Sequence, residues 1–343
     1  MAAIPCLGIP VWLESIPTIR RSGGKYGLAQ ADDRADPAVN GDHRLQSCSQ
    51  VARVRVRVLG TAAGGGFPQW NCVCSGCRAA RSEPERAKAR THSSAAVRAP
   101  SGRWLLINAS PDVADQLETL YDDGPAELAA VVLTDAELDH TLGLLRLREH
   151  ETPLTVVATP YVRRVLSVDF PIDSVLSHWA GLIWRDLLPE AGPIDIDGLI
   201  VEALSTGDKG PRFAACPSDK QAVVAIVVGQ AAGLVCAPAV ERIDSELESA
   251  LCAADCVLFD GTCWTDDELL SVRAGGRTAT QMGHLPLSGP SGSLHTLRAL
   301  DVRRVVLIHV NNTNPVLLDD SPERTFLQSM GVEVAEDGLE LAL

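Results

Sequence analysis

The sequence has 343 residues, of which 46% are hydrophobic and 22% are charged. A chain of this length and composition buries a large core in one long domain or two ordinary ones, which excludes general disorder and a small disulfide scaffold. Its 30 basic and 44 acidic residues give a net charge of −14. Because this charge repels phosphate backbones and anionic lipid headgroups, the composition argues against a nucleic-acid partner and a membrane-surface role.

Residues 1–50 differ from the rest of the chain, because Gly, Asp, Arg and Asn are mixed there without an apolar period. We expect a flexible N-terminal extension, or sequence that precedes the true start. The apolar beginning has no basic residue ahead of it and is interrupted by prolines, which makes it a poor secretory signal. These features favour a cytoplasmic protein.

The apolar stretch at residues 221–240 is long enough to suggest a membrane helix. It is broken by Gly229-Gln230, however, and it is rich in β-branched residues. The pattern therefore predicts two buried strands joined by a tight turn, and no membrane segment.

From Val51 the sequence alternates Val and Arg with the period of a half-exposed strand, and a glycine-rich turn follows. Further runs typical of strands lie at 94–99, 104–108, 128–134, 154–158, 199–204, 223–228, 233–236, 257–260, 305–309 and 332–334. Helical periodicity occupies residues 111–121, 244–254 and 321–331. This order predicts a layered α/β protein with sheets inside and helices outside.

Acidic and histidine side chains follow the buried strands directly. One strand runs into Asp135, Glu137, Asp139 and His140, another ends at Asp260 and a third at His309. A buried strand that ends in Asp or His provides a rigid platform for a metal ligand or a base. A single ending of this kind is common as a cap, but three of them, together with His284, favour one convergent site.

Three cysteines, Cys72, Cys74 and Cys77, lie within six residues, too close for ordinary disulfides. Three thiolates on a tight loop, with Gly76 letting the backbone turn back, suit a tetrahedral zinc ion in a reducing compartment. No acid or base adjoins the cluster, so we assign the zinc a structural role. Free buried cysteines or a redox pair are the alternatives, and the other cysteines are expected to be small core residues.

Several blocks of the sequence resemble one known family. They are LGTAAGGGFPQWNCVCSGC, INASPDV, LTDAELDHTLGLLRLRE, LSHW, FDGTCW, TATQMGHLPLSGPSGSL and LIHVNNTNPVLLDDSPER. Their order and content are similar to those of the PqqB family, the B proteins of pyrroloquinoline quinone (PQQ) biosynthesis, from residue 54 to the C-terminus. The resemblance implies that residues 51–343 form a metallo-β-lactamase fold, a four-layer αββα sandwich with a metal site along one edge between its sheets.

The resemblance also locates the metal site. Hydrolases of this fold carry His-x-His-x-Asp-His, where the chain has Asp135, Glu137, Asp139 and His140 in the four ligand positions. Only the second half of the motif is kept, and residues 204–213, where another histidine ligand is expected, contain none. We therefore do not expect the usual dinuclear hydrolytic site, although the two substituted carboxylates leave a weak oxygen-rich site open.

The remaining residues have a chemistry of their own. Asp139, His140 and His309 would give one ion two imidazoles and one carboxylate, the ligand set of non-haem Fe(II) oxygenases. The resemblance implies an iron- and oxygen-dependent hydroxylation of the tyrosine ring in the cross-linked Glu–Tyr unit cut from a precursor peptide. It further implies that Asp260 bridges or supports the metal, and we expect His284 to face the site as a proton-transfer or substrate-orienting group.

Other interpretations of the sequence stay open. The protein could instead be a soluble carrier of PQQ or its precursor, or a metal-dependent hydrolase, and it could form homo-oligomers. Asp139 could cap a helix, and His140 and His309 could be core residues. We expect supporting roles for Asp135 and Glu137, and either pocket lining or plain packing for His178 and Trp179. The candidates for the fourth ligand of the zinc are a water, Asn312 and His92.

Overall fold

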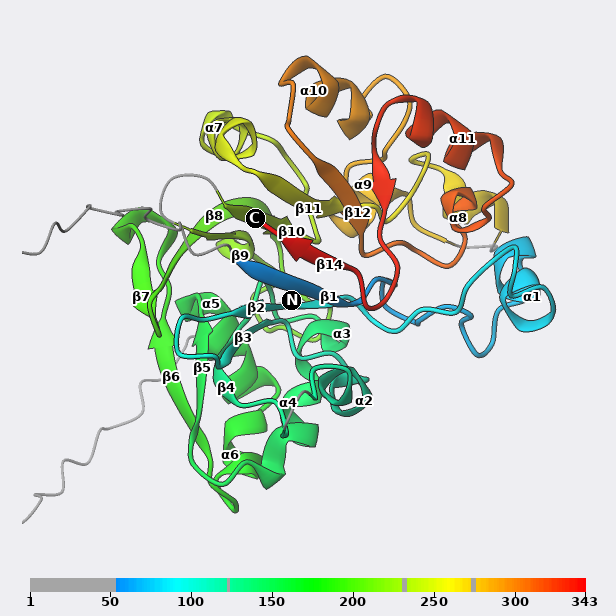
Figure 1. Ribbon diagram of the computed structural model, residues 1–343. Coiled ribbons are helices and arrows are strands. Elements are labelled where there is room, and N and C mark those ends of the chain that lie inside the picture. Colours follow the sequence, from blue (N-terminus) through cyan, green and yellow to red (C-terminus); the bar gives the residue numbers. More distant parts are fainter. Residues whose placement is uncertain (1–53, 122–123, 230–232, 273–275) are drawn as a thin grey trace, which may run out of the picture. The chain divides into compact units, whose positions relative to one another are not determined.

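The computed structural model describes residues 54–121, 124–229, 233–272 and 276–343. Within these residues the chain forms two seven-stranded sheets, with helices on the outer side of each (Figure 1). The N-terminal extension expected for residues 1–50 lies outside the described residues and stays a prediction.

The first sheet has the order β14-β1-β2-β3-β4-β5-β6. Neighbours from β14 to β3 pair antiparallel, and those from β3 to β6 pair parallel. Its strands are β1 Arg55–Gly60, β2 Ser94–Arg98, β3 Trp104–Ile107, β4 Leu128–Val132, β5 Leu154–Ala158, β6 Leu182–Asp186 and β14 Glu340–Ala342.

The second sheet has the order β13-β12-β11-β10-β9-β8-β7. Pairing is antiparallel from β7 to β10 and parallel from β10 to β13. Its strands are β7 Ile194–Ile196, β8 Leu199–Lys209, β9 Ser218–Val228, β10 Leu234–Ala237, β11 Cys256–Asp260, β12 Val305–Ile308 and β13 Glu333–Val334.

Short helices connect these strands. The α-helices are α1 Ser75–Ser82, α2 Val113–Glu118, α3 Leu138–Thr141, α4 Gly143–Arg146, α5 Pro160–Arg164, α6 Ile172–Leu176, α7 Ser245–Ala253, α8 Glu268–Val272, α9 Ala279–Met282, α10 Ser293–Ala299 and α11 Pro322–Ser329. Single 3₁₀ turns lie at Leu147–Glu149, Pro189–Ala191 and Pro315–Leu317, and a π-helical turn at Val165–Asp169.

Three apolar clusters hold the layers together. The central cluster joins the facing sides of the two sheets, through residues such as Ile107 and Val132 of the first and Ile226 and Ile308 of the second. A second cluster packs α2 and the helices from α4 to α6 on the outside of the first sheet, and a third packs α7, α10 and α11 on the second (Figure 1). The αββα sandwich predicted from the sequence is therefore confirmed.

Most predicted elements are present. The strand predicted at 154–158 is β5, and the helices predicted at 111–121, 244–254 and 321–331 are α2, α7 and α11. The apolar stretch at 221–240 supplies the antiparallel strands β9 and β10, as expected; residues 230–232 of its turn lie outside the described residues. No helix in the described part of the chain is long and apolar enough to cross a membrane.

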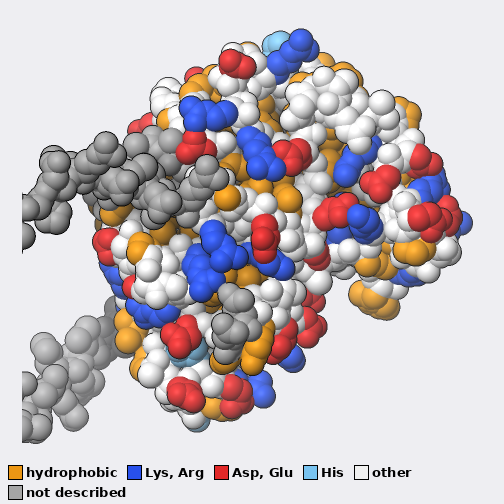
Figure 2. Space-filling view, viewed as in Figure 1, with side chains coloured by type: hydrophobic (Ala, Val, Ile, Leu, Met, Phe, Trp, Pro, Cys, Tyr) orange, Lys and Arg blue, Asp and Glu red, His pale blue; other side chains and the backbone are white. Residues whose placement is uncertain are grey.

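The surface carries exposed ion pairs. Arg86 pairs with Asp320 and Arg304 with Glu333, and basic and acidic side chains lie next to one another over much of the face in Figure 2. Exposed pairs of this kind contribute about 0–1 kcal/mol each. The stability of the fold therefore comes mainly from its three apolar clusters.

Candidate metal centres

The ends of three strands, one in the first sheet and two in the second, bring the predicted ligands together. Asp139 and His140 lie on α3, shortly after β4 of the first sheet, whereas Asp260 ends β11 and His309 follows β12 of the second sheet. His309 has a backbone φ of 54°, a conformation that costs an L-residue about 1–2 kcal/mol. Non-glycine residues held in this way concentrate at functional sites, and His309 is one of four such residues in the described part of the chain.

Donor atoms of Asp139, His140 and His309 converge on one point. One ligand atom from each of the three lies within 4.8 Å of the others. The Asp139 Oδ2 atom is 3.3 Å from His309 Nε2 and 3.8 Å from His140 Nε2. This arrangement lets one ion take two imidazole nitrogens and one carboxylate oxygen.

The hydrogen bonds of His140 show that its donor atom is available. Its Nδ1 lies 2.8 Å from Asp135 Oδ2, so this nitrogen donates its proton to the carboxylate and the lone pair is left on Nε2. The Nε2 atom is buried without a hydrogen-bond partner among the described residues. A buried polar atom without a partner is costly, and a metal ion at this point would satisfy it. The residues present therefore fit a metal.

The charges of Asp139, His140 and Asp135 shift one another's pKa values. Burial alone would raise the pKa of Asp139, but the positive charge of His140 and the hydrogen bond with His309 outweigh it and hold that pKa well below its usual value. Burial alone would lower the pKa of His140, yet Asp135 and Asp139 raise it to about 9. The two carboxylates thus stabilise a positive charge at the His140 ring, and a metal ion bound at Nε2 would supply that charge in place of the second ring proton.

Asp260 supports the site through hydrogen bonds. Its Oδ2 accepts from the backbone N–H of Val240 and lies 2.7 Å from His284 Nδ1, and its Oδ1 accepts from the Thr262 hydroxyl at 2.6 Å. Thr262 Oγ1 in turn lies 2.9 Å from His309 Nδ1. Both oxygens of Asp260 are therefore occupied, and their effect is to fix the rings of His284 and His309 through Nδ1, with Nε2 of His309 directed to Asp139.

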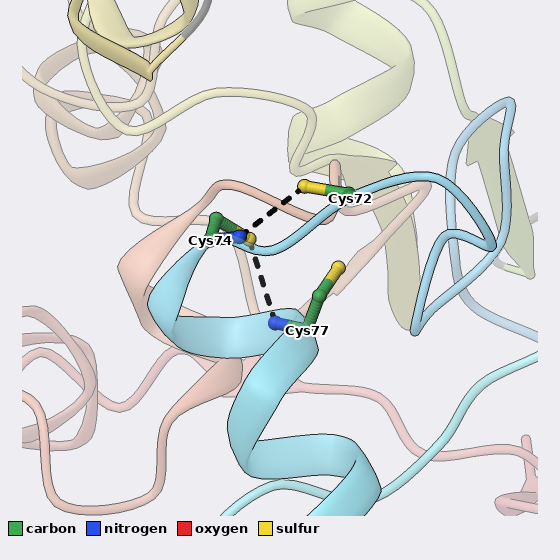
Figure 3. Close-up of side chains that lie close together, drawn as sticks. All are labelled: Cys72, Cys74 and Cys77. Atoms are coloured by element: carbon green, nitrogen blue, oxygen red, sulfur yellow. Dashed lines mark hydrogen bonds between the residues drawn. The ribbon is translucent and has the colours of Figure 1, made fainter.

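The three cysteines form the second candidate centre. One sulfur from each lies within 4.8 Å of the others, and Cys74 caps the start of α1 by accepting from Cys77 N at 3.4 Å (Figure 3). Burial would raise the pKa of Cys72, but hydrogen bonds, first from Cys74, lower it, whereas burial raises the pKa of Cys74 to about 12. The backbone thus gathers three sulfur ligands in the way that a zinc site requires.

Of the candidates for the fourth ligand, Asn312 lies at the cysteines. Its Nδ2 is 3.4 Å from Cys77 Sγ, and its backbone oxygen is 3.3 Å from Cys74 Sγ. The His92 ring instead contacts Asp112 and the backbone N–H of Gly65. The role predicted for Gly76 was wrong, because it lies inside α1, where a Cβ atom would come within 3.1 Å of the Asn312 oxygen. Glycine is needed there for close packing and not for a turn.

Known proteins are similar to this chain in sequence. A model of the beta-lactamase superfamily domain matches residues 103–310. The coenzyme PQQ synthesis protein B of Azoarcus sp. (strain BH72) is 44% identical over 305 residues, which cover 84% of this chain and 100% of that protein. That of Methylococcus capsulatus is 42% identical, covering 84% of this chain and 99% of its own. The chain belongs to the coenzyme PQQ synthesis protein B family.

Solved structures agree with this family and with the fold. The Zn²⁺-bound PqqB from Methylobacterium extorquens superposes with a TM-score of 0.76 at 35% identity, covering 84% of this chain and all of the other. A diphosphatase of the PhnP family, with a TM-score of 0.62 at 19% identity, shares the fold alone. The metallo-β-lactamase fold is thus confirmed, and metal binding is supported by the zinc-bound relative and by three candidate ligand groups in the described residues, the third being Asp260, His284 and His309.

In this member of the PqqB family the ligand group opens into a cavity of about 220 Å³. Its walls include residues that no sequence pattern predicted as part of the site, namely Thr262, Lys209, Glu241, Arg277 and Met282. His284 and Glu137 also line it, as does Asp135.

The suggestion that His178 and Trp179 line this pocket was wrong. His178 is exposed, and the Trp179 ring stacks with the Arg148 guanidinium. Neither residue is among those that line the cavity. Their segment follows α6, and its packing against Arg148 on the surface explains the aromatic residue there.

Asp135→Asn tests whether the supporting carboxylate matters to this PqqB site. The amide keeps the size of the side chain but loses the charge that orients His140 and raises the basicity of its Nε2. Loss of such an outer partner typically costs 10–100-fold in metal affinity, and we expect about that loss, measured by competition with a metal chelator. An unchanged affinity would show that Asp135 only fills space.

Glu268 predicts a pH effect on stability. This residue of α8 is buried, accepts from the Trp264 backbone N–H at 2.6 Å and contacts Thr313 next to Asn312. Burial raises its pKa to about 7. The folded chain therefore favours the protonated form of Glu268. The resulting contribution to the free energy of unfolding is fully present below the unfolded pKa of about 4.3, and it falls by about 3 kcal/mol as pH rises through the folded pKa of about 7.

Glu268→Gln should remove this pH dependence, because the neutral amide accepts from Trp264 and donates to Thr313. Denaturant unfolding between pH 5 and 8 should show the variant gaining stability over the parent as pH rises. Glu246→Gln, on the exposed first turn of α7, is the control and should change neither curve. Parallel curves for Glu268→Gln and the parent would contradict the prediction.

Proposed function

We propose that this chain acts in PQQ biosynthesis as an Fe(II)- and O₂-dependent hydroxylase of the tyrosine ring in a small, peptide-derived Glu–Tyr unit. The observation that carries the proposal is the ligand group Asp139, His140 and His309, with two imidazoles and one carboxylate around one point. This set, with open positions for substrate and oxygen, is typical of non-haem Fe(II) oxygenases. Membership of the PQQ synthesis protein B family supports the pathway.

The alternative of a dinuclear hydrolase is disfavoured by the same geometry. Its first two histidine positions hold Asp135 and Glu137. Asp135 is committed to His140 and to the Thr134 hydroxyl, so its oxygens are not free to hold a second ion. Two histidine–carboxylate groups remain among the described residues, Asp139–His140–His309 and Asp260–His284–His309, and both depend on the same His309.

The side chains have separate tasks in the proposed reaction. Asp139, His140 and His309 would hold iron, which supplies the redox chemistry that reduces oxygen. Asp135 keeps His140 in the tautomer that offers Nε2. Asp260 fixes His284 through Nδ1, which leaves its Nε2 facing the cavity to orient the phenol or move its proton. One oxygen atom enters the ring, the other leaves as water, and an external two-electron reductant balances the step.

The zinc at Cys72, Cys74 and Cys77 has a structural task in this proposal. Asn312 contacts the cysteine sulfurs and lies three residues after His309. Zinc would therefore fix the segment that carries a ligand of the iron, as well as the loop before α1. The thiols must stay reduced to bind zinc, so we place the protein in the cytoplasm. Formation of homo-oligomers stays a prediction.

Metal substitution tests the proposal against its alternatives. Chain loaded anaerobically with Fe(II) is mixed with a Glu–Tyr dipeptide, ascorbate and oxygen, and oxygen uptake is followed. We expect uptake that depends on iron and peptide, and none with zinc at the same site. Tight PQQ binding without oxygen uptake would favour the carrier, and cleavage of a bis-aryl phosphodiester by zinc-loaded chain would favour the hydrolase.

A further inference from the structure

The cavity of the ligand group carries positive charge as well as carboxylates. Lys209 and Arg277 both line it. The Lys209 ammonium is already used, because it lies 3.1 Å from Glu241 Oε1 and donates to the Thr280 carbonyl. For the Arg277 guanidinium, by contrast, no ion pair or hydrogen bond is found within the described residues. Arg277 is thus the cavity's unused cation.

A second arginine lies near the first. Arg212, in the connection between β8 and β9, is exposed and likewise has no ion-pair partner among the described residues. Burial lowers the pKa of Arg277 and the positive charge of Arg212 lowers it further, while Glu137 acts in the opposite direction without forming an ion pair. The positive charges of the two guanidinium groups therefore repel each other.

Most of the other charged groups of the cavity have partners, whereas the Glu137 carboxylate, which also lines it, forms no ion pair within the described residues. Asp135 and Asp139 interact with His140, and Glu241 with Lys209. Arg277 is exposed on the wall of the cavity and forms no ion pair with a carboxylate of the described residues, although the chain has a net charge of −14. A planar guanidinium binds a carboxylate through two parallel hydrogen bonds, so the partner that fits this wall of the cavity is a carboxylate from outside the chain.

We propose that Arg277 binds a carboxylate of the substrate and so selects phenols that carry an amino-acid carboxylate over neutral phenols. This inference rests on the proposed function, because it names the group by which the Glu–Tyr unit is held. Arg277 and the ligand group line the same cavity of about 220 Å³. That volume is below the range of about 300–1,000 Å³ for drug-sized ligands. It therefore suits a single amino-acid residue of the Glu–Tyr unit and not the whole unit.

Equilibrium binding without turnover tests the inference. Zinc-loaded full chain is titrated calorimetrically with the dipeptide Glu–Tyr and with Gln–Tyr amide, which has no carboxylate. Loss of a charge-assisted bond should weaken Glu–Tyr binding about 10- to 100-fold in Arg277→Gln. The variant and parent should bind the neutral peptide equally, and Arg277→Lys should recover part of the loss.

Arg163→Gln is the matched control, because Arg163 pairs with Asp186 on the surface and lines no part of this cavity. It should leave the affinity for both peptides unchanged. Equal losses for both peptides in Arg277→Gln, no loss for either, or no binding of Glu–Tyr to the parent would each overturn the inference.

Steady-state rates separate this inference from the proposed function. With iron-loaded chain, Arg277→Gln should raise KM for Glu–Tyr with little change in kcat, as expected for a binding contact made equally in ground and transition states. Hydroxylation with an unchanged KM in the variant would overturn the inference alone. Carboxylate-dependent binding through Arg277 without any hydroxylation would sustain the inference and refute the proposed function.

Discussion

Replacing His140 by alanine should remove iron from the Asp139, His140 and His309 group and leave zinc bound at the cysteines. The change deletes one of three ligands, and it also leaves Asp135 buried without its cationic partner. Iron and zinc per chain are measured by elemental analysis after anaerobic loading and desalting. We expect iron to fall from about one per chain to a trace, with hydroxylation lost.

Two control variants distinguish loss of the metal ligand from loss of the fold. His178→Ala removes an exposed histidine outside the cavity and should change neither metal. His140→Gln keeps a hydrogen-bonding side chain beside Asp135, so it retains the fold if the alanine variant does not. Retention of iron in a folded His140 variant would show that the metal is bound elsewhere.

Replacing Cys77 by serine should release zinc and strongly destabilise the chain. Cys77 is fully buried, and its sulfur is contacted by the backbone N–H of Gln69 and by Asn312. Structural zinc contributes its binding free energy to folding, and loss of a metal is among the few changes that cost more than about 4 kcal/mol. We expect a loss of that size in denaturant unfolding, with zinc absent from the purified variant.

Cys252→Ser is the matched control for the zinc prediction. Cys252 lies near the end of α7, is exposed, and contacts only the Leu300 carbonyl among the described residues. Its replacement should leave zinc content and stability unchanged. If Cys77→Ser unfolds at the same denaturant concentration as the parent while lacking zinc, the cysteine cluster has no structural role.

The ligand group could be predicted from the sequence because the pattern that positions it is local. A buried strand makes a rigid support for the residues after it: His309 follows β12 directly, and Asp139 and His140 lie on the short helix α3 after β4. The spacing of the cysteines is equally local. In both cases the side chains that act together lie near apolar runs or near one another along the chain.

The cationic wall of the cavity could not be predicted in this way. Lys209 ends β8, which continues five residues beyond the predicted 199–204, because its polar half pairs with β9 although the apolar alternation weakens there. Arg277 lies in a connection ahead of α9 and reaches the cavity only through tertiary packing. The packing of the two sheets determines which loops face the site. No short sequence pattern predicts this packing.

The environments of Gly76 and Trp179 have the same origin. A glycine beside a cysteine cluster was interpreted by its local freedom, whereas the close approach of Asn312, far away in the sequence, requires it. For Trp179 the sequence leaves pocket lining and plain packing open, and in the structure its ring packs against the Arg148 guanidinium at the surface. In each case a residue that is distant in the sequence, Asn312 or Arg148, determines the environment.

Oxygen incorporation tests the central claim most directly. Fe(II)-loaded chain is supplied with the Glu–Tyr dipeptide, ascorbate and isotopically labelled O₂, and the peptide is examined by mass spectrometry. The account predicts a peptide that gains one labelled oxygen atom on its tyrosine ring, in amounts that follow the iron bound at Asp139, His140 and His309. An unmodified ring with that iron site fully loaded, or a ring whose oxygen comes from water, would contradict it.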